Sequence, residues 1–347
     1  MLNIFYFSFF ILLLILINFF FIKKNLMLDS IKNERHKKLS NFTKNNRIPL
    51  SGGIFLYVSS VFFLKDNNFL LFFSFLILLI GILSDQNILI KPSVRLYLQL
   101  LVILFFVFFE NIYIKNINID FIDKNLLSIK FFSLIFTTFC ILVLVNGSNF
   151  IDGLNTLAAG YFASIFFLLI FISTKQNIYV DIILVKNFLF FLSIFLLFNF
   201  FGKAYLGDGG SYLLAFFVSK ILIDFANTNQ FVSPYFVVLI LWYPAFENLF
   251  SIIRKLFFKK SPYRPDALHL HQLIYNSFLK NNLISKVYLN TFVGILINTY
   301  NFLVMYIGSL YYNETSKICL LILFNAFLYL MIYSYLYKKN KTVDRYE

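Results

Sequence analysis

The chain has 347 residues, of which 60% are hydrophobic and only 13% are charged. Ordinary soluble proteins are about 45–50% apolar and about 25% charged, so this chain has too few charged side chains to cover a water-soluble globule. Its formal net charge of +14 is compatible with a nucleic-acid partner, but no zinc-finger, RNA-binding or helix-turn-helix signature accompanies that charge. The two cysteines, Cys140 and Cys319, lie in apolar runs, which excludes a disulfide scaffold and a thiolate metal site.

Eleven apolar segments qualify as candidate membrane spans by length and hydropathy. They are 2–22, 50–64, 68–84, 94–112, 128–145, 157–173, 182–201, 211–226, 233–253, 287–311 and 317–337. The first segment has no basic residue before it and no small-residue cleavage site, so we interpret it as a retained helix rather than a signal peptide. The sequence therefore predicts an all-α polytopic membrane protein of about 11 transmembrane helices. The whole chain, 1–347, forms one membrane domain in this interpretation, with no separate soluble domain.

Basic residues are distributed unequally between the two alternating sets of connections. One set, counted with Arg95 beside it, holds 22 of the 30 Lys and Arg residues; it comprises 23–49, 85–93, 146–156, 202–210, 254–286 and 338–347. Because connections rich in Lys and Arg stay in the cytoplasm, this asymmetry predicts an N-terminus outside and a cytoplasmic C-terminus. It also explains most of the net charge without a nucleic acid.

Two polar segments of the cytoplasmic set lie at the ends of the second and third predicted spans. Arg47 and Pro49 precede the pair Gly52 and Gly53, and Asp85 closes the third span. Glycine permits tight turns and close approach of the backbone to a ligand. Taken alone, the first segment is typical of a loop-to-helix turn, and Asp85 is typical of a solvated helix end.

A denser polar segment separates the fifth and sixth predicted spans. It carries Asn146, Asn149, Asp152 and Gly153. A short membrane loop needs only one turn residue, so this many polar positions indicate a functional role. If the segment is helical, Asn149 and Asp152 share a face at i, i+3 and can bind one cation or one nucleotide group together.

The segment 207–211, Gly-Asp-Gly-Gly-Ser, begins the eighth predicted span, and Lys203 lies just before it. Backbone N–H groups at a helix N-terminus, left accessible by glycines, predict an anion-binding cradle. Asp208 offers a hard oxygen ligand for Mg2+, which is usually bound by one or two carboxylates together with substrate phosphates. The alternative is a plain turn between two spans.

The largest cytoplasmic connection holds Arg264, His269 and His271 close together. A His-x-His pair can bind zinc, but no third ligand lies nearby, so contact with a phosphate or a sugar is favoured. Glu247 lies inside the ninth predicted span. A carboxylate inside a membrane is either a functional group or the partner of an internal hydrogen bond.

Four of these segments, in this order, resemble the polyprenyl-phosphate N-acetylhexosamine-1-phosphate transferases, the MraY/WecA-like superfamily that is also called glycosyltransferase family 4. The matching positions are Arg47, Pro49, Gly52 and Gly53; Asn146, Asn149, Asp152 and Gly153; Gly207, Asp208, Gly210 and Ser211; and Asp266, Leu268, His269 and His271. The resemblance covers roughly residues 35–280. Within the superfamily, the sequence resembles the branch that initiates surface polysaccharides more than the peptidoglycan translocase.

The resemblance implies a reaction in which a polyprenyl phosphate, such as undecaprenyl phosphate, attacks the β-phosphorus of a UDP-N-acetylhexosamine. The products are a polyprenyl-pyrophosphoryl sugar and UMP, and the product initiates a cell-surface glycan such as lipopolysaccharide. The resemblance further implies an enzyme of the inner (cytoplasmic) membrane, with the active site facing the cytoplasm and with a homodimer as its assembly. By the same resemblance, Asp85, Asp152 and Asp208 are catalytic, and Asp208 and Asp152 ligate Mg2+, with Mn2+ as an alternative. The implied substrate-binding residues are Arg47, Asn146, Asn149, Lys203, Arg264, His269 and His271.

One departure from the family pattern concerns the end of the third span, where an Asp-Asp pair is usual and this chain has Ser84 and Asp85. The acceptor phosphate is already mostly dianionic near neutral pH, because its second pKa is about 6, so we expect activity without the first Asp. Two other functions stay open from the sequence. One is a secondary transporter or lipid-glycan flippase, which would concentrate polar groups at mid-membrane; the other is a catalytically degenerate family member.

Overall fold

The computed structural model describes residues 4–29, 47–65, 67–89, 91–259, 268–279 and 286–343. These residues are mainly helical, and two strands, β1 (Leu28–Asp29) and β2 (Ile48–Pro49), form one short antiparallel pair. The helices are α1 (Ile4–Lys24), α3 (Gly52–Val61), α4 (Asn68–Asp85), α5 (Pro92–Glu110), α6 (Asp120–Ser128), α7 (Lys130–Ile151), α8 (Leu157–Gln176), α9 (Ile182–Phe200), α10 (Gly207–Thr228), α11 (Pro234–Ile240), α12 (Trp242–Phe257), α13 (Leu270–Leu279), α14 (Lys286–Ser309) and α15 (Thr315–Val343).

Nine of the described helices are long and apolar enough to cross a membrane, and the bent pair α11 and α12 adds a tenth if it is taken as one span. The prediction of an all-α polytopic membrane protein is thereby confirmed. The predicted number of about 11 is too high by this measure, because segment 50–64 contains only the ten-residue helix α3. Such a helix is about 15 Å long and cannot cross a hydrocarbon core of about 30 Å by itself. The orientation of the termini stays a prediction.

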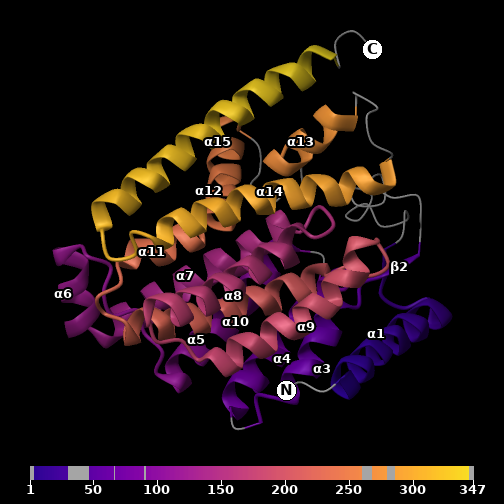
Figure 1. Cartoon of the computed structure of the whole chain (residues 1–347), viewed down its shortest axis with the longest axis horizontal. Helices are drawn as coiled ribbons and strands as arrows, with labels where there is room; N and C mark the ends of the chain where they lie inside the picture. Colours follow the sequence, from indigo (N-terminus) through magenta and orange to yellow (C-terminus); the bar gives the residue numbers. More distant parts are fainter. Residues whose placement is uncertain are drawn as a thin grey trace.

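Helix α10 lies at the centre of the bundle, and the first and last helices, α1 and α15, lie at its edges (Figure 1). In α10, 83% of the 18-residue apolar stretch is buried inside the protein. In the corresponding stretches of α1 and α15, only 17% and 22% are buried. Figure 1 shows α1 and α15 on opposite sides of the molecule, with α4, α7, α8 and α10 between them. The polar start of α10 is therefore held inside the protein rather than exposed to lipid.

Local signals explain several helix starts. Asn67 and Asp181 cap α4 and α9 with their side chains, which accept hydrogen bonds from the backbone N–H groups of Leu70 and Leu184. Pro92 stands at the first turn of α5, where its fixed φ suits the helix and its missing N–H costs nothing.

The break between α11 and α12 has an identifiable cause. Pro244 has no N–H, so the carbonyl of Ile240, four residues earlier, loses its helical hydrogen-bond partner. The hydroxyl of Tyr161 on α8 donates to this carbonyl at 2.7 Å, which satisfies it in the interior. The two helices meet at a 74° bend, and α12 carries Glu247 away from the direction of α11.

Glycines allow α3, α4 and α10 to approach one another at backbone distance. A Cβ atom on Gly81 of α4 would lie 2.2 Å from the Cα of Gly209, and one on Gly53 of α3 would lie 2.6 Å from the nitrogen of Gly210. Small residues serve this purpose in membranes, where apolar surface alone does not drive helices together. The close approach brings the C-terminal end of α4 onto the first turn of α10.

Candidate functional site

The Asp208 carboxylate, in the first turn of α10, is hydrogen-bonded by groups from three other helices. Its Oδ2 accepts from the hydroxyl of Ser84 on α4 at 2.6 Å and from Nη1 of Arg95 on α5 at 3.1 Å. Its Oδ1 accepts from Nδ2 of Asn149 on α7 at 2.5 Å. Arg95 also donates to the Ser84 hydroxyl at 2.5 Å. We call Ser84, Arg95, Asn149 and Asp208 the Asp208 cluster.

Asp85 occupies the position where the sequence predicted an anion-binding cradle. Its Oδ1 accepts from the backbone N–H of Asp208 at 3.0 Å, and its Oδ2 accepts from that of Gly209 at 3.3 Å. Gly207 adopts φ +73°, and a Cβ atom there would approach Asp85 Oδ2 to 2.8 Å. The prediction of a cradle open to substrate is therefore wrong for these two N–H groups, because a carboxylate of the same chain fills it. Asp85 is 5% exposed, and its placement favours a role in fixing the first turn of α10.

Asp152 presents a carboxylate with no internal hydrogen bond among the residues that the structure describes. It follows the last residue of α7 and is half-buried. Desolvation and the negative charge of Asp208 raise the pKa of the Asp152 carboxyl to about 8. A cation bound at this point would relieve the repulsion between the two carboxylates.

The donor set of Asp152 and Asp208 fits Mg2+ or Mn2+ but not a site built from protein ligands alone. In the described part of the chain, no group of three or more His, Cys, Asp or Glu side chains is placed to hold a metal ion. Mg2+ is usually bound by one or two carboxylates, with water and substrate phosphates completing its shell. The contacts from Ser84, Arg95 and Asn149 use three of the roughly four lone-pair positions of Asp208, which leaves one on Oδ1 for a cation.

The two asparagines predicted as substrate contacts lie within a helix, not in a loop. The sequence placed 146–156 in a connection, but α7 continues to Ile151. Asn146 donates to Gln99 Oε1 on α5 at 3.1 Å, whereas Asn149 donates to Asp208. The structure therefore brings Asn149, Asp152 and Asp208 together and places Asn146 about one turn earlier in α7.

The predicted histidines lie beside the end of α7. His269 and His271, at the start of α13, are 6% and 0% exposed, and their rings stack with centroids 5.7 Å apart. The ring of Phe150 lies 5.2 Å from that of His269. A Cβ atom on Gly153 would lie 2.3 Å from Nε2 of His271, so this glycine permits the close contact. Arg264 and Asp266 of the same motif lie outside the described residues.

Two predicted basic residues are not brought into the Asp208 cluster. Arg47 and Lys203 are both exposed, and the ammonium group of Lys203 lies 6.0 Å from the centroid of the Phe201 ring. The segments that carry them do meet, because the backbone of Tyr205 exchanges hydrogen bonds with Pro49 and Gly52. Both cations thus lie beside the segment that leads into α10, where they can attract an anionic substrate.

Arg95 is a candidate site residue that the sequence interpretation missed, since it served there only as a marker of topology. Among the residues that the structure describes, Arg95 is the cation that pairs with Asp208. A signal was present: Arg95 is a cation inside a predicted span, ten residues after Asp85, and such residues are expensive in a membrane unless they are functional.

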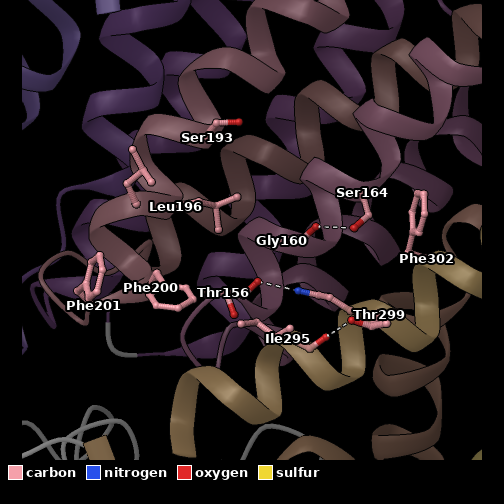
Figure 2. Close-up of a pocket in the computed structure, with 12 residues that line it drawn as sticks. Thr156, Gly160, Ser164, Ser193, Leu196, Phe200, Phe201, Ile295, Thr299 and Phe302 are labelled. Atoms are coloured by element: carbon pink, nitrogen blue, oxygen red, sulfur yellow. Dashed lines mark hydrogen bonds between the residues drawn. The ribbon is translucent and has the colours of Figure 1, made fainter. Parts of the chain in front are cut away.

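A separate cavity of about 620 Å³ lies between α8, α9 and α14. Figure 2 shows Thr156, Gly160 and Ser164 of α8 opposite Ile295, Thr299 and Phe302 of α14. No ionisable side chain lines it, and the hydroxyls of Ser164 and Thr299 donate to carbonyls of their own helices. This cavity is therefore not suited to phosphate chemistry. The Asp208 cluster is the better candidate.

Comparison with known proteins gives consistent similarities. A model of glycosyl transferase family 4 matches residues 68–226. The undecaprenyl-phosphate alpha-N-acetylglucosaminyl 1-phosphate transferase of Thermotoga maritima is 26% identical over 227 residues, which cover 65% of this chain and 67% of that protein. The protein of the same name from Haemophilus influenzae is 28% identical over 307 residues, covering 83% and 84%. A probable undecaprenyl-phosphate N-acetylglucosaminyl 1-phosphate transferase from Bacillus subtilis is 27% identical over 208 residues, covering 57% and 55%.

Proposed function

We propose that this chain, which is similar to glycosyl transferase family 4 over residues 68–226, is a member of that family. In this proposal it transfers an N-acetylhexosamine 1-phosphate from a UDP-sugar to a polyprenyl phosphate. Relatives of similar length are undecaprenyl-phosphate N-acetylglucosaminyl 1-phosphate transferases by name, which supports undecaprenyl phosphate as the acceptor and UDP-N-acetylglucosamine as the donor. The products are a polyprenyl-pyrophosphoryl sugar and UMP.

The observation that carries this proposal is the convergence of Asp208, Asp152 and Arg95 at neighbouring ends of three helices, α10, α7 and α5. An oxygen of the acceptor phosphate attacks the β-phosphorus of the donor, and the bond from that phosphorus to the bridging oxygen of UMP breaks. Phosphoryl transfer requires positioning and charge neutralisation rather than a covalent intermediate. Arg95 supplies a cation and Asn149 an amide beside Asp208, which suits both requirements.

Asp208 and Asp152 are the residues that would hold Mg2+, or Mn2+ in its place. When bound, the ion neutralises phosphate charge. Ser84, Arg95 and Asn149 orient the Asp208 carboxylate, and Asp85 holds the first turn of α10 in place. His269 and His271 lie next to Phe150 and Gly153, where they can contact the diphosphate or the sugar of the donor.

The distribution of basic residues supports an active site that faces the cytoplasm, in the inner membrane. A nucleotide sugar made in the cytoplasm could reach such a site directly. The lipid-linked product would then initiate a surface glycan. A homodimer is a further part of this proposal that rests on the family resemblance alone.

The test is an assay of the purified protein with radiolabelled UDP-N-acetylglucosamine, undecaprenyl phosphate and Mg2+. We expect a labelled, lipid-soluble product together with UMP, and we expect EDTA to abolish both. A parallel reaction with UDP-N-acetylgalactosamine identifies the preferred sugar. If neither donor gives product while the folded protein binds undecaprenyl phosphate, a flippase or a degenerate family member becomes the better explanation.

A further inference from the structure

The loop that joins α7 to α8 begins with Asp152 and ends in an unusual backbone conformation. We call residues 152–156 the α7–α8 loop. Its last residue, Thr156, adopts φ +64°, in the left-handed region. A β-branched residue is a genuine outlier there, because its Cβ atom crowds the backbone. Such strain persists only where the surrounding structure imposes it, and it is concentrated at functional sites.

The carboxylate of Asp152 depends on this loop for its position. It accepts no hydrogen bond from the residues that the structure describes, and its neighbours act on it through desolvation and charge. The backbone N–H of Asp152 donates to the carbonyl of Ser148 at 3.1 Å, which ties the start of the loop to α7. How far the carboxylate can move is therefore determined by what holds the other end of the loop.

Three asparagine side chains from two other helices hold that end. Oδ1 of Asn290, on α14, accepts from the backbone N–H of Asn155 at 2.6 Å. Oδ1 of Asn199, on α9, accepts from the backbone N–H of Thr156, also at 2.6 Å. Nδ2 of Asn298, on α14, donates to the carbonyl of Thr156 at 2.8 Å (Figure 2). Asn290 and Asn199 are only 1% and 5% exposed, so water does not compete for these bonds.

Helix α14 contacts the α7–α8 loop at two further positions. A Cβ atom on Gly294 would lie 2.2 Å from the carbonyl oxygen of Asn155, so this glycine permits the close approach. The hydroxyl of Thr291 accepts from Nδ2 of Asn155 at 3.3 Å and donates to the carbonyl of Phe200 at 2.8 Å. A helix outside the region matched to the family thus meets the backbone that carries Asp152.

We propose that Asn290 is a positioning residue for Asp152. With the two other asparagines it imposes the strained turn at Thr156, and it thereby holds the Asp152 carboxylate where Asp152 and Asp208 can share one divalent cation. This inference rests on the proposed function. A ligand that is fixed before binding loses less conformational entropy when the ion arrives, so the ion is bound more tightly. Without Asn290 the turn at Thr156 can relax, and the carboxylate moves away from Asp208.

The first test measures metal binding without turnover. Free Mn2+ gives an electron paramagnetic resonance signal that is lost on binding, so a titration of the purified protein gives the dissociation constant. In Asn290→Leu we expect this constant to rise about tenfold, the lower end of the range typical when a residue that orients a metal ligand is lost.

Asn301→Leu is the matched control for this titration. Asn301 is also on α14 and also 1% exposed, but its amide donates to the carbonyl of Ile297 in its own helix. Its replacement should leave the dissociation constant for Mn2+ within about twofold of wild type. Equal dissociation constants in the Asn290 and Asn301 variants, or a wild-type protein that binds no Mn2+, would overturn the proposal.

The second test is kinetic. In Asn290→Leu, the Mg2+ concentration that gives half-maximal transferase activity should rise about tenfold, and excess Mg2+ should restore most of the rate. The KM for undecaprenyl phosphate should stay within about twofold. A rate that is lowered by the same factor at every Mg2+ concentration would assign Asn290 a merely structural role.

A third variant keeps the proposal testable if Asn290→Leu does not fold. Thr291→Val removes only a hydroxyl and should raise the dissociation constant for Mn2+ about two- to fivefold. Thr299→Val, on the same helix, removes a hydroxyl that donates within α14 and should leave the constant unchanged; equal effects of the two would contradict the proposal. A wild-type protein without transferase activity would contradict the proposed function, whereas the Mn2+ affinities would still decide whether α14 positions Asp152.

Discussion

The two ends of α10 carry ionisable residues in very different surroundings. At its C-terminal end, Lys220 and Asp224 form an ion pair at i, i+4 along one helix, with Asp224 partly exposed. At its N-terminal end, Asp208 is bound by Ser84, Arg95 and Asn149, each from a different helix.

The difference separates a structural pair from a site. Lys220 and Asp224 neutralise each other locally, and pairs of this kind contribute about 0–1 kcal/mol. At the other end, the described residues place one cation, Arg95, beside Asp208, while Asp85 and Asp152 add two more acids nearby. Acids that crowd together in a folded protein need a further cation or a proton, and this need supports the proposal that metal and phosphate chemistry takes place at the N-terminal end.

The strongest test of this contrast is Asp208→Asn. We expect it to lower the transferase activity about a thousandfold, because a preorganised charged group at the reacting phosphates is lost. Its unfolding temperature without metal should change little, because the lost ion pair with Arg95 is offset by relief of the negative charge that raises the pKa of Asp152. The same lipid-product assay on Asp224→Asn should show less than a twofold change; similar losses in both variants would erase the contrast.

The close approach that builds the N-terminal end can be disrupted by a single methyl group. Gly81→Ala places a Cβ atom 2.2 Å from the Cα of Gly209, and such overpacking costs about 1–3 kcal/mol. Thermal unfolding in detergent should show a clear decrease in midpoint, and the activity should fall because Asp85 and Asp208 move apart. Thr228→Ala, at the opposite end of α10, is the control. A midpoint equal to wild type for Gly81→Ala would mean that the two helices are not packed so closely.

Ser84→Asp adds an acid directly against Asp208 and Arg95. In saturating Mg2+ we expect activity within about tenfold of wild type, because the transfer can proceed from an acceptor phosphate that is already dianionic. The gain in unfolding temperature on adding Mg2+ should be larger than in wild type, since more negative charge is compensated. Abolished activity in this variant would show that the Ser84 hydroxyl has a role of its own.

The raised pKa of Asp152 predicts how stability depends on pH in EDTA. An unfolded Asp ionises near pH 4, whereas the folded carboxyl, with its pKa of about 8, keeps its proton. The folded state therefore binds more protons in this range, and stability should fall as the pH rises from about 4 to about 8. Asp152→Asn should flatten this part of the profile in thermal unfolding, and an identical slope in the variant would contradict the assignment.

The smallest effect is expected at the C-terminal end of α10. Lys220→Met should change the free energy of unfolding by less than about 1 kcal/mol and the activity by less than twofold, because a partly exposed pair at i, i+4 contributes little. A large loss of activity here would show that the two ends of α10 do not differ in function as proposed.

Much of the site was predictable because its residue types are rare in so apolar a chain. Asp152, Asp208, His269 and His271 stood out as polar residues at the ends of apolar runs, and their motifs matched a family pattern. Arg95 was not identified as a partner of Asp208, since the two residues lie 113 positions apart in the sequence. The prediction that the anion cradle is open to substrate failed for the same reason. Only the folded chain brings Asp85 onto the first turn of α10.

The sequence by itself determined the class of this protein, because helical spans in a membrane are specified by local hydropathy and each satisfies its own backbone hydrogen bonds. It also determined which residues are available for chemistry. The tertiary structure alone decided how those residues are used: glycine contacts bring α4 onto α10, so Asp85 caps a helix while Asp208 is oriented from three sides. Hydrogen bonds between helices depend on distances that no local pattern encodes.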